Sequence, residues 1–226
     1  MNPVALTEYP DRDTLMRTLA ALVSGQLRAA LATKGRASLA VPGGTTPGPF
    51  LQALSQEKLA WDRVSVLPTD ERLVLASDAR SNLGLIEKTL KQDEASVARL
   101  VALFDPAEDP GVAQARVEEV LPLDILVIGM GADMHTASLF PDAPELPLAL
   151  AETAPPLMVL KPESQPEARI SLTAPVLRAA EAAHILIAGP EKKAALERAQ
   201  ADGPFTAAPI RVVFTAACPV TVHYAD

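Results

Sequence analysis

The sequence GMGADMHTASLFP, from Gly129 to Pro141, directly follows the apolar run LDILVI, from Leu123 to Ile128. A short apolar run of this kind predicts a buried strand, and the glycine pair after it allows a tight turn. Such a strand would deliver the polar side chains of the turn to one end of a sheet, where open α/β sheets bind their ligands. The segment therefore predicts an α/β fold with a functional site in this turn, and the side chains concerned are Asp133, His135, Thr136 and Ser138.

His135 is the main candidate for chemistry in the turn. An imidazole titrates near neutral pH and can therefore act as a base. Asp133 lies two residues earlier, where it can fix the tautomer of the ring or stabilise an imidazolium. The alternative is a structural histidine, which we expect for His184 and His223 because neither has comparable polar neighbours.

Predicted strands and helices alternate along the rest of the chain. Apolar residues recur at helical spacing from Asp13 until Gly35, which is typical of an amphipathic helix. Because parallel strands need crossover connections, the alternation predicts a largely parallel sheet with helices on both faces. We therefore expect a single Rossmann-like three-layer α/β domain over residues 1–226. The other predicted strands are 38–41, 64–67, 157–160, 184–188 and 210–214, the other helices are 50–54, 81–90, 112–120 and 191–199, and the proline-rich stretch 141–156 is expected to be a long surface loop.

The motif PGGTTP, at residues 42–47, follows one predicted strand and precedes a helix. Gly43 and Gly44 are flexible. Thr45 and Thr46 offer hydroxyl groups, and the helix start supplies free backbone amides. Together these groups can form a phosphate-binding loop, although a glycine pair before a helix is often no more than a turn.

The motif TDERLV, at residues 69–74, follows another predicted strand. At least one acid of the triplet and the arginine can therefore point into the same crevice as the other two turns. Our candidates are Asp70 and Arg72, with Glu71 as the other acid that could do so. A solvated turn is the alternative, because exposed acid and base triplets are usually no more than that.

Two cations late in the chain are candidates for phosphate binding. Arg169 follows a proline-rich loop, and Lys192 lies at the start of the helix predicted at 191–199. Guanidinium and ammonium groups both bind phosphate. Taken singly they are ordinary surface charges, and the adjacent Lys193 is an equally suitable lysine.

The composition limits the class of protein. Hydrophobic residues make up 49% of the chain and charged residues 21%, which excludes a disordered chain. No apolar stretch reaches the roughly 18 residues of a membrane helix. A formal net charge of -8 without a basic run argues against a nucleic-acid partner. The lone Cys218 cannot form an intrachain disulfide and the N-terminus lacks the features of a signal peptide, so we expect a cytoplasmic protein with no membrane or nucleic-acid partner.

No metal and no other cofactor is expected. The histidines are far apart in sequence, and only His135 has carboxylates at close spacing. Met134 stands where a dinucleotide-binding motif would have its third glycine. Ser138 lacks the G-x-S-x-G context of a nucleophilic serine.

The segment GMGADMHTASLFP resembles the signature G-x-G-x-D-G-H-T-A-S-L-F-P of the 6-phosphogluconolactonase family, with Met134 in place of one glycine. Further segments match in the family's order: PGGTTP, TDERLV with ARSN at 79–82, and RISLT at 169–173 followed by AGPEK at 188–192. The resemblance implies hydrolysis of 6-phospho-D-glucono-1,5-lactone to 6-phospho-D-gluconate in the oxidative pentose phosphate pathway. The expected partner is thus a small phosphorylated sugar lactone, and the expected assembly is a monomer or a small homo-oligomer.

Roles for the candidate residues follow from this resemblance. We hypothesise that His135 deprotonates an attacking water, oriented by Asp133, with no covalent intermediate. The backbone amides of the turn at 129–131 or Arg72 would stabilise the oxyanion. Asp70 completes the catalytic candidates, and the residues implied to bind substrate or phosphate are Gly43, Gly44, Thr45, Thr46, Arg169 and Lys192.

Two alternative functions remain open at this point. Glucosamine-6-phosphate deaminase/isomerases share the fold and a related D-G-H motif, but they carry D-E-Y and H-I-A-F-N-E-P. In this chain Arg72 replaces the tyrosine, and the stretch 135–141 lacks the glutamate. The second alternative is a non-catalytic sugar-phosphate-binding protein, against which the acid and the histidine of the turn argue.

Overall fold

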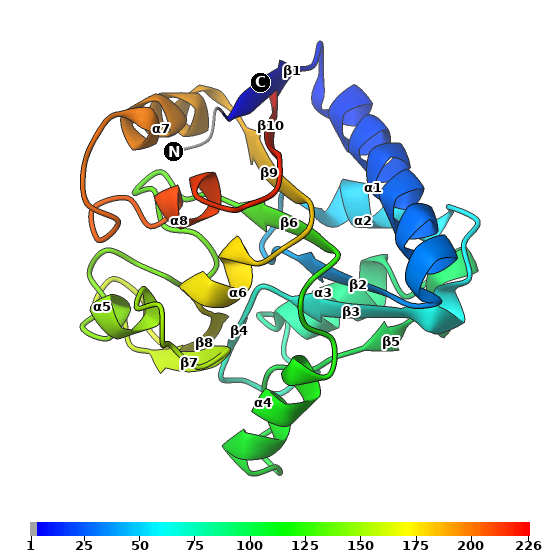
Figure 1. Ribbon diagram of the computed structural model, residues 1–226, viewed down its shortest axis with the longest axis horizontal. Helices are drawn as coiled ribbons and strands as arrows, with labels where there is room; N and C mark the ends of the chain where they lie inside the picture. Colours follow the sequence, from blue (N-terminus) through cyan, green and yellow to red (C-terminus); the bar gives the residue numbers. More distant parts are fainter. Residues whose placement is uncertain (1–3) are drawn as a thin grey trace.

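The computed structural model describes residues 4–226. Residues 1–3 lie outside the described part. They belong to the N-terminal segment in which the sequence analysis found no signal peptide. Within residues 4–226, seven strands form one sheet in the order β1-β10-β9-β6-β2-β3-β5, and every neighbouring pair is parallel (Figure 1). The predicted parallel sheet is therefore confirmed. The strands are β1 (Ala5–Glu8), β2 (Ala37–Val41), β3 (Val64–Pro68), β5 (Arg99–Leu100), β6 (Ile125–Gly129), β9 (Ala183–Ala188) and β10 (Val220–Ala225).

A second, antiparallel sheet lies beside the main one. Its order in the described chain is β4-β8-β7, with β4 at Asp70–Arg72, β7 at Leu157–Leu160 and β8 at Arg169–Leu172. The strand predicted at 157–160 exists, but it belongs to this small sheet. The pairing of β4 with β8 places Arg72 opposite Arg169, so two candidate site residues from distant segments become neighbours.

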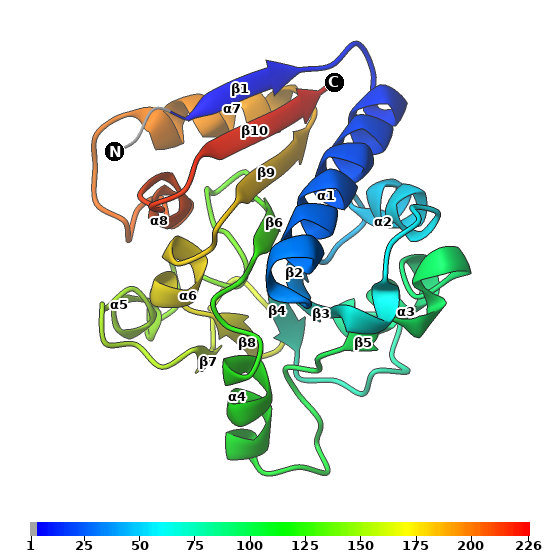
Figure 2. The ribbon, with the colours of Figure 1, turned by 45° about the vertical axis from the view of Figure 1, so that its right-hand side comes forward.

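Helices cover both faces of the main sheet, as predicted (Figure 2). Successive residues of β2 show this directly. Leu39 and Val41 pack with residues of the helices at 12–34 and 48–55, whereas Ala40 packs into the core on the other face of the sheet. Among the described helices, none combines the length and apolar character that a bilayer crossing requires. One face carries α1 (Arg12–Lys34), α2 (Gly48–Ser55) and α3 (Asn82–Thr89), and the core of the other includes residues of α4 (Pro110–Glu118), α5 (Leu146–Ala149), α6 (Ala174–Arg178), α7 (Pro190–Gln200) and α8 (Arg211–Phe214).

Local chemistry sets the ends of the long first helix. Asp11 accepts a hydrogen bond from the Thr14 amide at 2.7 Å and so caps the N-terminus. Gly35 ends the helix with a φ of 72°, a left-handed conformation that glycine adopts without steric cost. The predicted start and end of this helix are thus explained by its caps.

The strand order reverses between β2 and β6. The chain leaves β2 toward β3 and β5 on one side, and it leaves β6 toward β9 and β10 on the other. In open α/β sheets, such a reversal leaves a crevice at the carboxyl ends of the two strands. The turns that follow β2 and β6 are PGGTTP and GMGADMHTASLFP, so the topology brings the two predicted motifs together.

Two sequence predictions about the C-terminal half are wrong. Residues 210–214 are not a strand, because Arg211–Phe214 forms the short helix α8, in which the Val213 amide donates to the Ile210 carbonyl at 2.9 Å. All four of its residues are buried, and a short apolar run buried on every side does not distinguish strand from helix. The stretch 141–156 is not wholly a surface loop either, because it contains α5, whose Leu146 and Ala149 lie in the core.

A buried hydrogen-bonded chain joins the N- and C-terminal parts of the fold. His184 on β9 lies 3.0 Å from His223 on β10, measured from Nδ1 to Nε2. The other nitrogens contact Gln26 at 2.8 Å and the Tyr9 hydroxyl at 2.9 Å. With both rings neutral and protonated at Nε2, every group in the chain has a matching donor or acceptor. Both histidines therefore have the structural setting that the sequence predicted for them.

Candidate active site

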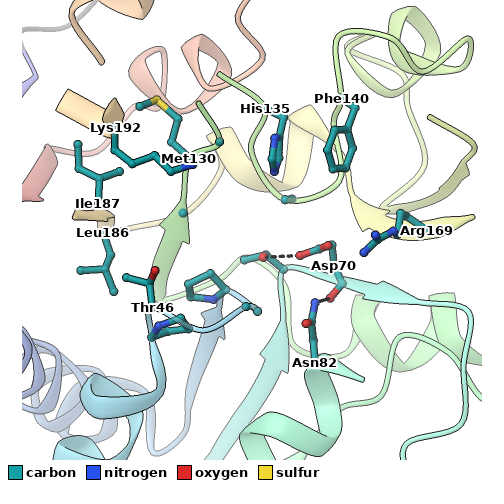
Figure 3. A pocket seen from close by; sticks show the side chains of 18 of the residues that line it. Thr46, Asp70, Asn82, Met130, His135, Phe140, Arg169, Leu186, Ile187 and Lys192 are labelled. Carbon is teal, nitrogen blue, oxygen red and sulfur yellow. Dashed lines mark hydrogen bonds between the residues drawn. The ribbon is translucent and has the colours of Figure 1, made fainter. Parts of the chain in front are cut away.

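A cavity of about 310 Å³ lies where the turns after β2, β3 and β6 meet (Figure 3). Most of the predicted site residues line it, although they come from segments far apart in the chain. Thr45 is not among the lining residues, and Asp133 contributes through its bond to His135. The predicted residues that line the cavity are Gly43, Gly44, Thr46, Asp70, Arg72, His135, Arg169 and Lys192.

His135 is held by its own turn. Its Nδ1 lies 2.6 Å from the Asp133 carboxylate, which also accepts the His135 amide at 3.2 Å. Burial raises the pKa of Asp133, but the hydrogen bond and the charge of His135 outweigh burial and lower that pKa below its usual value. Asp133 thus remains a carboxylate that can accept the Nδ1 proton, which leaves Nε2 as the ring nitrogen able to take up a proton.

The turn has two special backbone positions. A Cβ atom at Gly131 would lie 2.1 Å from Nδ1 of His135, so only glycine leaves room for the ring. Met134 has a φ of 67°, a left-handed conformation that favours glycine. Its side chain packs against the core and its carbonyl accepts the Ile210 amide at 3.1 Å. These contacts offset a cost of about 1–2 kcal/mol for the left-handed conformation, and His135 keeps its place.

The glycine loop packs against α3. A Cβ atom at Gly43 would lie 1.9 Å from the Asn82 side-chain amide, so the loop approaches α3 closely. Gly44 has a φ of 86°, which again favours glycine. No side chain caps the N-terminus of α2, where backbone amides and the helix dipole favour an anion.

The acids of TDERLV separate into two roles. The Asp70 side chain is only 8% exposed, accepts the Ser138 hydroxyl at 2.6 Å and lines the cavity. Glu71 instead accepts the Ser81 hydroxyl and the amides of Asn82 and Leu83, at 2.9, 2.8 and 2.7 Å. Glu71 therefore fixes the start of α3, whereas Asp70 connects β4 to the His135 turn.

Arg72 and Arg169 form a pair of cations on one wall. Both have a buried Nε atom without a hydrogen-bond partner in the described chain. Arg169 donates to the Gln165 side chain at 2.7 Å, and its pKa is lowered by burial and by the charge of Arg72. The charges of Asp70, Glu167 and Glu71 act on the pKa of Arg169 in the opposite direction. The two neighbouring guanidinium groups favour the binding of an anion from solution.

The two adjacent lysines of α7 point to different partners. Lys192 lines the cavity, whereas Lys193 forms an ion pair with Glu8 on β1 at 2.7 Å. Figure 3 shows Lys192 and Thr46 on one side of the cavity and Arg169 on the other, with His135 and Asp70 between them. The cavity thus has a cation at each end.

Residues that the sequence analysis did not select also line the cavity, among them Asn82, Phe140 and Gln165. Asn82, in the ARSN segment, donates to the Asp70 carbonyl at 2.7 Å, and Phe140 stacks on His135. Both residues lie in segments that resemble the family's motifs, so the sequence indicated a role for these segments. It did not show what the two side chains contact. Gln165 carried no signal. Of the proposed oxyanion donors, the Gly131 amide is already used, because it donates to the His135 carbonyl at 2.9 Å.

Within residues 4–226 no group of three or more His, Cys, Asp or Glu side chains could hold a metal ion. The groups that line the cavity are instead one imidazole, one carboxylate, three cations and free backbone at a helix start. This set suits a phosphorylated ligand with a reactive carbonyl group.

Comparison with known proteins places the chain in a family. The family of glucosamine-6-phosphate isomerases/6-phosphogluconolactonase matches residues 10–222. The 6-phosphogluconolactonase of Pseudomonas aeruginosa is 42% identical over 92% of this chain and 89% of its own length. That of Mesorhizobium japonicum is also 42% identical, over 96% of this chain and 93% of its own.

Solved structures agree with the sequence relatives. A 6-phosphogluconolactonase from Shewanella baltica superposes with a TM-score of 0.93 at 30% identity, over 100% of this chain and 99% of that one. The likeness therefore extends over the whole fold. The chain belongs to the glucosamine-6-phosphate isomerase/6-phosphogluconolactonase family.

Proposed function

We propose that this enzyme hydrolyses 6-phospho-D-glucono-1,5-lactone to 6-phospho-D-gluconate, the lactonase step of the oxidative pentose phosphate pathway. The observation that carries the proposal is the His135–Asp133 pair, at 2.6 Å, with His135 in a cavity that the PGGTTP loop lines at one side. The identity of the substrate is inferred from the curated relatives, which are named 6-phosphogluconolactonase.

His135 acts as the base in the proposed reaction. Its Nε2 takes a proton from a water molecule, whose oxygen attacks the lactone carbonyl carbon. The resulting tetrahedral oxyanion collapses, the bond from the carbonyl carbon to the ring oxygen breaks, and the imidazolium returns its proton to that oxygen. The new acid then loses its proton to solvent and leaves as the carboxylate. Asp133 keeps the Nδ1 proton in place and stabilises the imidazolium.

The two ends of the cavity have different roles in the proposed reaction. Gly43, Gly44, Thr46 and Lys192 line the same cavity as the turn that leads into α2, and they bind the phosphate group. Arg72 and Arg169, on the other wall, lie closer to the lactone end, where they stabilise the oxyanion. Asp70 lies between these ends, held by Ser138, and accepts hydrogen bonds from sugar hydroxyl groups.

The proposal is tested with purified protein and freshly prepared lactone. Acid release at constant pH, corrected for spontaneous opening of the lactone, should be strongly accelerated. Ammonia release from glucosamine 6-phosphate, measured in parallel, should stay at background. Binding of 6-phosphogluconate without lactone turnover would contradict the proposal and favour a sugar-phosphate-binding protein, and ammonia release would favour a deaminase.

Lys192 should matter for substrate binding and Lys193 should not. We expect Lys192→Ala to lower kcat/KM about 30-fold, mainly through KM, because loss of one charged hydrogen bond to phosphate costs about 2 kcal/mol. Lys193→Ala is the matched control, since the Lys193 ammonium group binds Glu8 instead. Steady-state kinetics of both variants test this, and equal effects of the two substitutions would contradict the assignment.

A further inference from the structure

The phenyl ring of Phe140 lies against the imidazole of His135. The two ring centroids are 4.0 Å apart and the planes are inclined by 23°. Figure 3 shows both rings at the same edge of the cavity. Phe140 is 5% exposed and belongs to the hydrophobic core, whereas the His135 side chain is 28% exposed. The phenyl ring is thus part of a fixed wall, and the imidazole lies between that wall and the cavity.

The backbone of the turn brings these two rings together. The Leu139 amide donates to the Thr136 carbonyl at 2.9 Å, so the chain folds back between residues 135 and 140. Ala137, with a φ of 48°, makes this reversal possible. Ser138 anchors the reversal from outside the turn, because its hydroxyl donates to Asp70 and its amide to the Ser171 hydroxyl at 3.1 Å. The stack is therefore built into the fold.

The surrounding charges give the stack a chemical consequence. Asp133 is the carboxylate in contact with His135, and the charged groups that line the same cavity are Asp70, Arg72, Arg169 and Lys192. Three of these four are cations, so a further positive charge on the imidazole meets repulsion. An aromatic face attracts a cation within about 6 Å of its centre. The Phe140 ring is thus placed to offset that repulsion.

We propose that Phe140 is a positioning residue of this enzyme, whose ring both orients the His135 imidazole and stabilises the imidazolium formed when water loses its proton. The inference rests on the proposed function, because it assumes that His135 is the base. It makes two demands: the aromatic face must be needed, and its electron density must matter.

The first demand is tested by changing the side chain. Phe140→Leu keeps an apolar residue but removes the aromatic face, and we expect kcat to fall about tenfold with little change in KM. Phe140→Tyr keeps the ring and should retain most of the activity. Equal losses in both variants would contradict a role for the ring face.

The second demand is tested by a series of phenylalanine analogues with one, two and three fluorine atoms at position 140. Fluorine withdraws electron density from the ring face with little change in shape, so kcat should fall stepwise, while the acid limb of the kcat/KM profile moves to lower pH. The same series at Phe214, which is 1% exposed and lies in α8, is the control and should leave kcat unchanged. A purely structural role for Phe140 predicts no graded response.

The possible outcomes separate this inference from the proposed function. A graded loss at position 140, absent at 214, supports the stack. An active wild-type enzyme that depends on His135 but responds equally to every analogue at position 140 overturns the inference and leaves the lactonase proposal intact. A wild-type protein without lactonase activity overturns both.

Discussion

Replacement of His135 by glutamine is expected to lower kcat for lactone hydrolysis about a thousandfold, with a much smaller change in KM. General base catalysis typically contributes about 10²–10⁴ in rate, and a thousandfold loss corresponds to about 4 kcal/mol of transition-state stabilisation. Glutamine retains polarity and similar length but cannot accept a proton at neutral pH. Initial rates of acid release, corrected for the spontaneous reaction, measure the effect.

A matched control comes from the same residue type outside the cavity. His184→Gln makes the same substitution in the buried chain with His223, which does not line the cavity, and it should leave kcat at neutral pH within about twofold. Unfolding curves of both variants verify that each is folded. If His135→Gln turned over lactone at a rate near that of the wild type, the role of His135 as the base would be refuted.

The main features of the fold were predictable because they depend on local pattern. The apolar run before Gly129 and the alternation of strands with helices predicted the parallel sheet, and Gly35 marked the end of α1. β1 was not predicted, because all four of its residues are exposed and carry no apolar pattern. Within residues 4–226 its only strand neighbour is β10, so the evidence for β1 lies in pairing with the other end of the sequence rather than in its own residues.

The candidate site was predictable to the level of motifs but not of contacts. Asp70 and Glu71 are adjacent in sequence and chemically alike, yet one lines the cavity and the other fixes the start of α3. Lys192 and Lys193 differ only by about 100° of rotation around α7. Strands alternate sides and helices rotate, so a shift of one residue changes the partner completely. Only the packed structure distinguishes such neighbours.

A second large effect should appear in the stability of the fold toward acid. Burial lowers the pKa of His184 to about 4, and burial together with the charge of His184 lowers that of His223 to about 4, from an ordinary value of 6.5. A histidine whose pKa is lowered by folding is protonated first in the unfolded chain. Each neutral, buried histidine therefore makes its full contribution to the free energy of unfolding above pH 6.5, and this contribution is lost as the pH falls toward 4. A shift of this size corresponds to about 3 kcal/mol per histidine when fully developed.

The double variant His184→Gln/His223→Gln should remove most of this dependence, because each glutamine still offers one donor and one acceptor but does not titrate. We therefore expect the wild type to lose several kcal/mol of unfolding free energy between pH 7 and pH 4.5, and the double variant to lose much less. Urea unfolding at several pH values measures both. Asp78, whose pKa is lowered to about 2, begins to lose its stabilising effect only near the acid end of this range. It is present in both proteins and therefore does not obscure the comparison. Parallel pH dependence in the two proteins would show that the buried pair is not the acid-sensitive element, whatever the stability of the variant at neutral pH.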